Sequence, residues 1–250
     1  MPETPQRYTT AREHQVGGTH YQDQVMQPWD IIEATMQVRL IAMTKPVIAE
    51  CQEATDLLAY CARVSNPGNQ ANTETAPRLL AYLVRKAHWS PFEMASMTLE
   101  IRTTRAIAHQ ILRHRSFSFQ EFSQRYAVAP PEPVLSEARL QDAANRQASH
   151  ETDDAQLQAW WRDEQRSLAR YSASIYEQAL RRGIAKEVAR NVLPEGMTES
   201  VLYMAGTIRS WIHYCQLRCE PGTQKEHREV ALACRAVLLE QFPALVEVLS

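Results

Sequence analysis

The sequence predicts a mixed α/β fold with long helices in its second half. Residues 94–103 alternate between apolar and polar side chains, as expected of a strand with one buried face. Residues 155–182 instead carry apolar side chains at the spacing of an amphipathic helix. A further long helix is expected to begin at Thr198, as its N-cap, and to run to about residue 217.

Apolar stripes and chain-breaking residues place the other elements. The Asn-Pro-Gly turn at 66–68 ends the first helix and Pro194 ends a short one, because proline lacks a backbone donor. Gly183 suits the left-handed position after the long helix, and Thr223 with Glu226 matches a capping box for the last one. The helices predicted in this way cover residues 51–63, 73–87, the residues just before Arg113, 185–192, and the chain from 223 onward.

Composition limits the class of protein. With 250 residues, 44% of them hydrophobic, the chain can bury a substantial core. Its formal charge of −2 does not favour a general nucleic-acid binder, so any anion site has to be local. No run reaches the roughly 18 apolar residues that a membrane span needs. The polar N-terminus also lacks the apolar segment of a signal peptide.

The cysteines indicate the redox compartment. Five cysteines, an odd number without C-x-x-C spacing, indicate reduced thiols in the cytoplasm of a bacterium or of a phage-infected host. Cys215 and Cys219 are four positions apart, but no matching pair follows at zinc-finger spacing. No metal site is therefore expected.

Two regions differ from the rest in composition. Residues 1–42 are polar and carry a Gly-Gly turn signal, which predicts a flexible or loosely docked extension. Residues 43–250 are expected to form a single domain. A proline-rich, polar insertion interrupts this domain near 127–157, and a lid or a subunit contact is most expected there.

The stretch Arg113–Tyr126, RHRSFSFQEFSQRY, is the strongest functional signal. Its serines and first glutamine alternate with two phenylalanines, so an extended conformation separates the polar side chains from the rings. On the preceding helix Gln110, Arg113 and His114 share a face. Guanidinium groups bind phosphate through two hydrogen bonds, and serine hydroxyls add donors. The cluster is typical of a site for an anionic, planar ligand, although many Arg-rich runs are solvated faces.

This string resembles the signature R-H-R-x-x-S-x-N-E-x-S-x-R-Y of the flavin-dependent thymidylate synthases. Gln120 departs from it, because many members carry Asn there. The residues in register are Arg113, His114, Arg115, Ser118, Glu121, Ser123, Arg125 and Tyr126. Four further stretches resemble the same family: ARVS at 62–65, HWSPFE at 88–93, AKEVARNVLP at 185–194 and GTIRSWIHYCQLR at 206–218.

The resemblance extends from about residue 50 to about 245, with two further departures. Many members have a histidine two residues after the Phe of the HWSPFE motif, where this chain has Met94 and Ala95. Thr207 stands where Asn is common, a change expected to weaken one flavin hydrogen bond.

The resemblance implies a fold and a reaction. The fold would be a small twisted sheet surrounded by long helices. The reaction would be the reductive methylation of dUMP to dTMP, with 5,10-methylenetetrahydrofolate as carbon donor and NADPH-reduced FAD as hydride source. No cysteine nucleophile would be needed, unlike in the classical enzyme. The protein would be a methyltransferase and a homotetramer with sites between subunits, and no nucleic acid or membrane partner is implied.

The family's residue roles transfer to the matching positions. Arg218 and Ser123 are the expected catalytic residues, with the charge of Arg218 stabilising the pyrimidine as N3 ionises. The expected dUMP-binding residues are Gln110, Arg113, Glu121, Ser123, Arg125, Arg190 and Arg218. The expected FAD-binding residues are Ser65, His88, Ser90, Arg113, His114, Arg115, Glu121, Arg209 and His213.

Two other classes stay open on the residues alone. A non-catalytic nucleotide or single-stranded nucleic-acid binder would use the arginines and stack bases on Phe117 and Phe119. The near-neutral overall charge counts against it. A phosphotransferase or nuclease would use His114 as acid and base. It would also need a carboxylate-bound metal, and only Glu121 is near in sequence.

Overall fold

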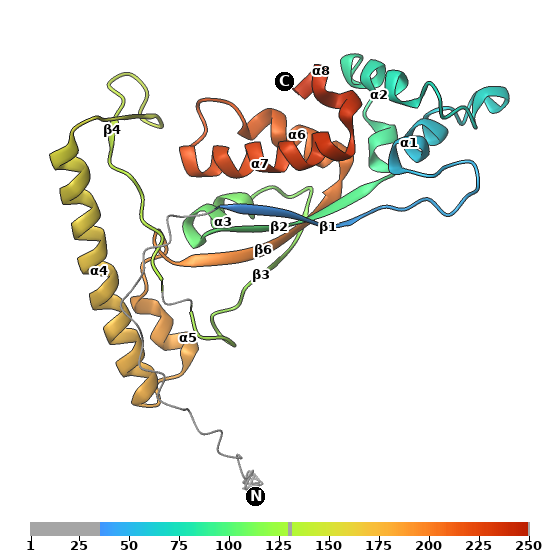
Figure 1. Cartoon of the computed structure of the whole chain (residues 1–250). Coiled ribbons are helices and arrows are strands. Elements are labelled where there is room, and N and C mark those ends of the chain that lie inside the picture. The colour runs from blue at the N-terminus through green and yellow to red at the C-terminus, as the bar shows by residue number, and fades with distance from the viewer. Residues whose placement is uncertain (1–35, 130–131, 250) are drawn as a thin grey trace, which may run out of the picture. The chain divides into compact units, whose positions relative to one another are not determined.

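The structure, a computed structural model, describes residues 36–129 and 132–249. They form the predicted mixed fold: a four-stranded antiparallel sheet in the order β1-β2-β6-β3, with helices packed against it (Figure 1). Among these residues no helix is long and apolar enough to cross a membrane. The strands are β1 Gln37–Met43, β2 Ser96–Thr104, β3 Ser118–Glu121 and β6 Glu199–Thr207, and a separate hairpin comprises β4 Arg139–Gln141 and β5 Ser149–Glu151.

Most helices lie where the sequence predicts them. The predicted strand at 94–103 is confirmed by β2, and Gly183 takes a left-handed φ of +80° just after α4. The helices are α1 Ala54–Ala62, α2 Ala76–Arg85, α3 Arg105–Ile111, α4 Ala155–Arg181, α5 Lys186–Ala189, α6 Ile208–Arg218, α7 Lys225–Gln241 and α8 Val246–Leu249. The 3-10 turns are η1 Pro67–Asn69, η2 Ser90–Glu93, η3 Arg190–Val192 and η4 Pro243–Leu245.

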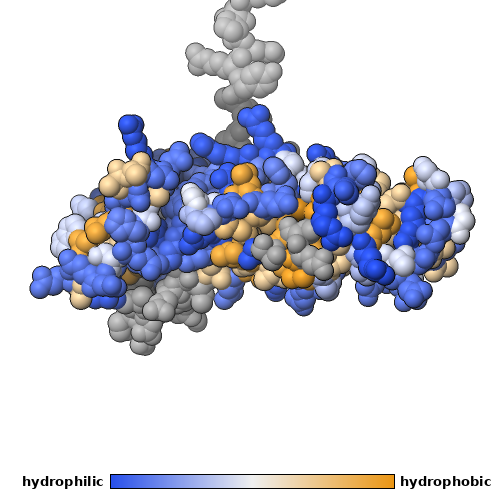
Figure 2. Space-filling view, turned by 90° about the horizontal axis from the view of Figure 1, so that it is seen from above, coloured by the Kyte–Doolittle hydropathy of each residue, from blue (hydrophilic) through white to orange (hydrophobic). Residues whose placement is uncertain are grey.

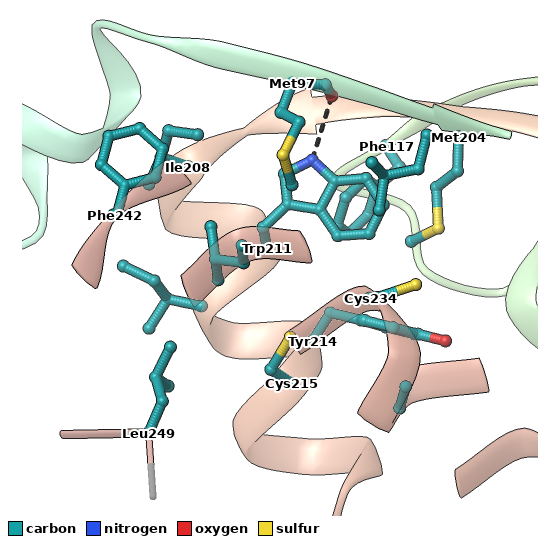
Figure 3. Close-up of a cluster of buried hydrophobic side chains, with 14 of the residues drawn as sticks. Met97, Phe117, Met204, Ile208, Trp211, Tyr214, Cys215, Cys234, Phe242 and Leu249 are labelled. Carbon is teal, nitrogen blue, oxygen red and sulfur yellow. Dashed lines mark hydrogen bonds between the residues drawn. The ribbon is translucent and has the colours of Figure 1, made fainter. Parts of the chain in front are cut away.

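The main core lies between the sheet and the helices α6 and α7, which cover one face of it (Figure 1). Leu99 of β2, Leu202 of β6 and Trp211 of α6 are each 0% exposed. The indole Nε1 of Trp211 donates to the backbone oxygen of Met97 at 3.0 Å (Figure 3). Full burial of one large apolar side chain stabilises a fold by about 1.5–3 kcal/mol. The buried Trp211 therefore holds α6 firmly on the sheet. Seen from above, the surface is mostly hydrophilic, with separate hydrophobic patches (Figure 2).

The predicted helix from Thr198 to about residue 217 is wrong in its first half. Residues 199–207 form β6, an inner strand of the sheet, and the helix begins only at Ile208. The alternation of Ser200, Leu202 and Met204 as buried residues is the strand period, which long-range pairing with β2 selects over a helical reading. Thr198 does not cap the helix; its hydroxyl donates to the backbone oxygen of Pro194 at 2.8 Å.

Two boundary predictions also need correction. Residue 42 falls inside β1, which pairs with β2, so residues 37–42 belong to the sheet and not to an extension. Residues 1–35 lie outside the described part of the chain. The predicted capping box at Thr223 is wrong: α7 begins after Gln224, without a side-chain cap. Glu226 instead accepts from Gln224 at 2.9 Å and pairs with Arg139 at 2.7 Å.

The insertion near 127–157 carries the β4-β5 hairpin, which ion pairs fasten to the start of α7. Lys225 Nζ lies 2.6 Å from Glu137 and 2.5 Å from Glu151. Arg139 bridges Glu137, at 3.1 Å, and Glu226. The hairpin is therefore tied to the first turn of α7.

Candidate active site

The signature stretch comprises the turn after α3, strand β3 and the residues that follow it, and it buries the ring of Phe117. Ser116, Ser118 and Gln120 are exposed, which confirms the predicted alternation. Phe117 is 8% exposed and packs edge-on against Trp211, with ring centroids 4.8 Å apart. Because Phe117 is part of the core, it is unable to stack nucleobases, and the nucleic-acid alternative loses half of its proposed platform.

Gly206 of β6 is required by this packing. A Cβ at this position would overlap the ring of Phe117, whereas a Cβ at Gly196 would meet nothing within 4 Å. We expect Gly206→Ala to lower the free energy of unfolding by about 1–3 kcal/mol, because overpacking displaces Phe117 and the signature turn. Urea unfolding measures the change, and Gly196→Ala is the matched control. Equal stabilities for the two variants would contradict this packing argument.

One cavity joins three of the sequence motifs. It has a volume of about 510 Å³ and is lined by Trp89, Glu93, Ser116, Thr207, Arg209, Ser210, His213 and Gln216. Arg209 Nη1 lies 2.5 Å from Glu93 Oε1, and the hydrogen bond from Arg209 holds the pKa of Glu93 below its ordinary value. The fully buried Phe92 anchors η2, so the neighbouring Glu93 faces α6. Sequence reasoning assigned no role to Glu93, although it ends the matched hexapeptide.

Thr207 has a structural role at the edge of this cavity. Its hydroxyl accepts from the backbone N of Ser210 at 3.3 Å and caps α6. Asn and Thr are both good N-cap residues, so the departure from the family pattern preserves the helix start. The other expected flavin residues on nearby turns, His88, Ser90 and Ser65, are exposed and do not line the cavity.

A second group centres on His114. Its Nε2 accepts a hydrogen bond from Arg218 Nε at 3.0 Å, and its ring stands edge-on to Tyr214, 4.9 Å between centroids. Burial, with the charges of Arg218 and His213, lowers the pKa of His114 to about 4. His114 is therefore neutral near pH 7 and serves as an acceptor. This argues against a phosphotransferase that uses His114 as its general acid.

Gln110 belongs to the same neighbourhood through residues that sequence reasoning missed. Its Oε1 lies 3.2 Å from Nδ1 of His227, and its Nε2 donates to Gln224 at 2.7 Å. His227 is 1% exposed and its pKa is lowered to about 4 by burial and by the charges of Arg218 and His114. No motif pointed to His227, because its contacts come from α3 and α6.

These two imidazoles predict how stability depends on pH. His114 and His227 bind protons near pH 6.5 when unfolded but near pH 4 when folded. Unfolding therefore takes up protons between these values, and the free energy of unfolding falls as pH drops from 6.5 to 4. The fall is up to about 3 kcal/mol for the fully buried His227 and smaller for the partly buried His114, whose charge solvent screens. Urea unfolding at several pH values measures this. The slope should shrink in His227→Asn and persist when the exposed His150 is replaced, and an unchanged slope in His227→Asn would contradict the assignment.

The remaining substrate residues form a third group. Arg125 Nε pairs with Glu187 at 3.2 Å, and Arg190 Nε donates to the backbone oxygen of Glu187 at 3.3 Å. Ser123 accepts from the backbone N of Arg125 at 3.4 Å. This group adjoins α5, which lies on the side of the sheet opposite to α6 (Figure 1). Within one chain, Arg125 and Arg190 are thus not brought together with Arg218.

Glu121, Arg113 and Arg115 complete the predicted set. Glu121 Oε1 accepts from Ser200 at 2.7 Å and from Arg105 at 3.4 Å, so its carboxylate is held in place. Arg113 and Arg115 are exposed. Over residues 36–129 and 132–249, neither side chain has a hydrogen-bond or ion-pair partner, which leaves both guanidinium groups available to a ligand. Within residues 36–129 and 132–249 there is no cluster of His, Cys, Asp and Glu that suits a metal.

Available guanidinium groups, a neutral histidine held by Arg218 and a cavity with charged walls make up a candidate site for anionic, planar ligands. A family model described as "Thymidylate synthase complementing protein" matches residues 46–244. The chain is 51% identical over 215 residues to a probable flavin-dependent thymidylate synthase of Paramecium bursaria Chlorella virus 1, covering 86% of this chain and 99% of that protein. It is 52% identical over 218 residues to the flavin-dependent thymidylate synthase of Synechocystis, covering 86% and 100%.

Solved structures agree with these relatives. The UMP/dUMP methylase PolB from Streptomyces cacaoi, bound with 5-Br dUMP, has a TM-score of 0.72 and 28% identity, covering 86% of this chain and 96% of that one. The chain belongs to the flavin-dependent thymidylate synthase family. Its function is that of a thymidylate synthase of the methyltransferase class, and its cofactor is a flavin.

Proposed function

We propose that this enzyme converts dUMP to dTMP, with 5,10-methylenetetrahydrofolate as carbon donor and NADPH as the reductant of bound FAD. The observation that carries the proposal is the hydrogen bond between Arg218 and His114, which joins two motifs 104 positions apart. The similar methylase PolB is bound with 5-Br dUMP in one structure and with 5-Br UMP in another. A pyrimidine nucleotide is also the anionic, planar ligand that the arginines of this chain suit.

The Arg218 guanidinium is proposed to act on the pyrimidine ring. His114 engages its Nε, so the Nη1 and Nη2 groups stay free to donate to a planar acceptor. The positive charge stabilises a ring that becomes anionic as it reacts. Gln110 is proposed to bind dUMP through its amide, which His227 links to Tyr214 of α6. Arg113 and Glu121 of the signature stretch are also proposed to bind dUMP. Ser123, Arg125 and Arg190 are proposed to hold the phosphate.

The 510 Å³ cavity is proposed to hold part of the flavin. Trp89 supplies an apolar wall, Arg209 and His213 supply polar side chains, and Glu93 holds Arg209 in position. The unpaired Arg113 and Arg115 suit the two phosphates of FAD. When bound, FAD supplies the hydride that completes the new methyl group. His88, Ser90 and Ser65 stay proposed contacts on the adjoining turns, and His114 and Glu121 on the signature stretch.

No thiol is proposed to act as nucleophile. Cys51, Cys215 and Cys234 are buried. A hydrogen bond from Cys215 lowers the pKa of Cys219 to about 7, but Cys219 packs against the hydrophobic core. It follows Arg218 directly in the chain, so the two side chains leave the end of α6 in different directions. The proposed location is the cytoplasm, on the sequence argument from an odd number of cysteines.

A homotetramer is proposed because the third group lies across the sheet from Arg218. On the long helix α4, Trp160 is 56%, Leu168 52% and Tyr171 68% exposed. We infer a protein contact surface from these three apolar side chains, which recur on one helix. A second copy that covers this surface would be able to bring its Arg125 and Arg190 to the Arg218 of the first.

Spectroscopy and isotope release test the proposed reaction. The purified protein should be yellow and yield FAD on denaturation. With NADPH and methylenetetrahydrofolate it should release tritium from C5 of labelled dUMP and form dTMP. A protein that takes up FAD but releases no tritium would refute the reaction, and one that binds no FAD on titration would refute the cofactor.

A further inference from the structure

A chain of hydrogen bonds runs from α6 to α7, then to α3 and back to the start of α7, beside the candidate site. The Tyr214 hydroxyl lies 3.2 Å from His227 Nε2, and His227 Nδ1 lies 3.2 Å from Gln110 Oε1. Gln110 Nε2 donates to Gln224 Oε1 at 2.7 Å, and Gln224 Nε2 donates to Glu226 Oε2 at 2.9 Å. Tyr214 and His227 are each 1% exposed, so water does not compete for their bonds. We refer to these five residues as the relay.

The Glu226 carboxylate sets the direction of the relay. An ionised carboxylate only accepts hydrogen bonds, so Gln224 turns its NH2 group toward Glu226 and its oxygen toward Gln110. Gln110 then donates from Nε2 and presents Oε1 to His227. His227 must therefore donate from Nδ1, which leaves its Nε2 to accept from Tyr214.

Neighbouring charges keep each member in the required protonation state. Burial raises the pKa of Glu226, but hydrogen bonds from its own backbone, from Gln224 and from Arg139 hold it below its ordinary value. Burial raises the pKa of Tyr214, so its hydroxyl keeps the proton that it donates. His227 is neutral for the reasons given above. Every donor in the relay therefore meets an acceptor in only one arrangement, in which the hydrogen bonds run from Tyr214 toward Glu226.

We propose that His227 is a positioning residue that orients the amide of Gln110 for substrate. This role rests on the proposed function, in which Gln110 binds dUMP. Gln110 is only partly buried, so one N–H and one lone pair of its amide stay free for a ligand. With His227 and Gln224 both engaged, the amide is unable to rotate by 180° and exchange its donor for its acceptor. Without His227, only the hydrogen bond to Gln224 would hold the Gln110 amide, and the amide would be able to rotate.

Titration of the FAD-loaded enzyme with dUMP tests this role. We expect His227→Leu to weaken dUMP binding about tenfold, the effect of one lost hydrogen bond at a fixed amide. His227→Asn should keep most of the affinity, because its amide nitrogen occupies the place of Nδ1. Gln110→Ala should weaken binding at least as much as His227→Leu does. The double variant should bind dUMP no more weakly than Gln110→Ala alone, since His227 acts through Gln110.

Glu226→Gln gives an independent test with a matched control. A carboxamide at this position is able to donate, so the relay loses its fixed direction and dUMP affinity should fall as in His227→Leu. Glu137 also pairs with Arg139 but lies outside the relay, and Glu137→Gln should leave dUMP affinity unchanged. FAD binding should stay normal in every variant, which separates positioning from a general loss of structure.

The outcomes distinguish this role from the proposed function. If Gln110→Ala weakens dUMP binding while both His227→Leu and Glu226→Gln bind it normally, the positioning role is overturned and the function stands. Additive losses in the double variant also overturn it. If Gln110→Ala binds dUMP normally, the assignment of Gln110 as a substrate residue fails and the positioning role fails with it. Should His227→Leu not fold, the His227→Asn and Glu226→Gln results decide.

Discussion

Arg218→Lys is expected to lower the rate of dTMP formation roughly 10²–10³-fold, by analogy with the loss of one oxyanion donor. Lysine keeps the positive charge but has no Nε, so the hydrogen bond to His114 is lost. Its single ammonium group also lacks the two parallel donors that a planar ring requires. FAD absorbance should stay near that of the wild type, because the proposed flavin contacts are other residues. Steady-state and single-turnover assays measure the effect.

A competing explanation is that Arg218 only complements the dipole of α6, in whose last turn it lies. That role is worth about 0.3–1 kcal/mol of stability and tolerates lysine. Arg181 is the matched control, since it lies in the last turn of α4 and is exposed. Within the described part of the chain its guanidinium pairs only with Glu177 in the preceding turn. Arg181→Lys should leave turnover unchanged. If Arg218→Lys also forms dTMP at nearly the wild-type rate, the dipole explanation is correct.

Mixing two inactive variants should restore activity. Arg190→Ala and Arg218→Ala are each expected to lose at least 10²-fold in turnover, because each removes a charged contact to the nucleotide. Arg190 lies by α5 and Arg218 on α6, on opposite sides of one sheet (Figure 1). If different copies supply them, a mixed oligomer contains some sites with both arginines intact. Random assembly gives roughly a quarter of the wild-type sites, from one half for each arginine.

The experiment is to unfold and refold the two variants together and to assay dTMP formation. Each variant refolded alone is the control, and a mixture of Arg218→Ala with Arg218→Lys should stay inactive because both lack the same residue. Absence of recovery in a mixture that exchanges subunits would place all the arginines of one site in one chain. If all the arginines of a site lie in one chain, replacing Trp160 and Tyr171 by charged residues should leave activity unchanged. If the site is shared between copies, the same replacements should dissociate the oligomer.

Local patterns in the sequence were sufficient for much of this protein. The alternation at 94–103, the helical stripe at 155–182 and Gly183 each specified an element, because period and backbone preference depend on neighbouring residues. The ligand-binding character of the signature stretch was also predictable, because its arginines, serines and glutamate lie within fourteen consecutive residues. The family and the class of reaction followed from these strings and were confirmed by the comparisons.

Tertiary structure alone decided the features that depend on distant partners. Residues 199–207 became a strand because β2 and β3 pair with them on both sides, which outweighed the helical pattern that continues after 207. Residues 37–42 joined the sheet for the same reason. His227 and Glu93 acquired their contacts only when α7 met α3 and η2 met α6. Such contacts join residues as much as 117 positions apart, a separation that no local pattern records.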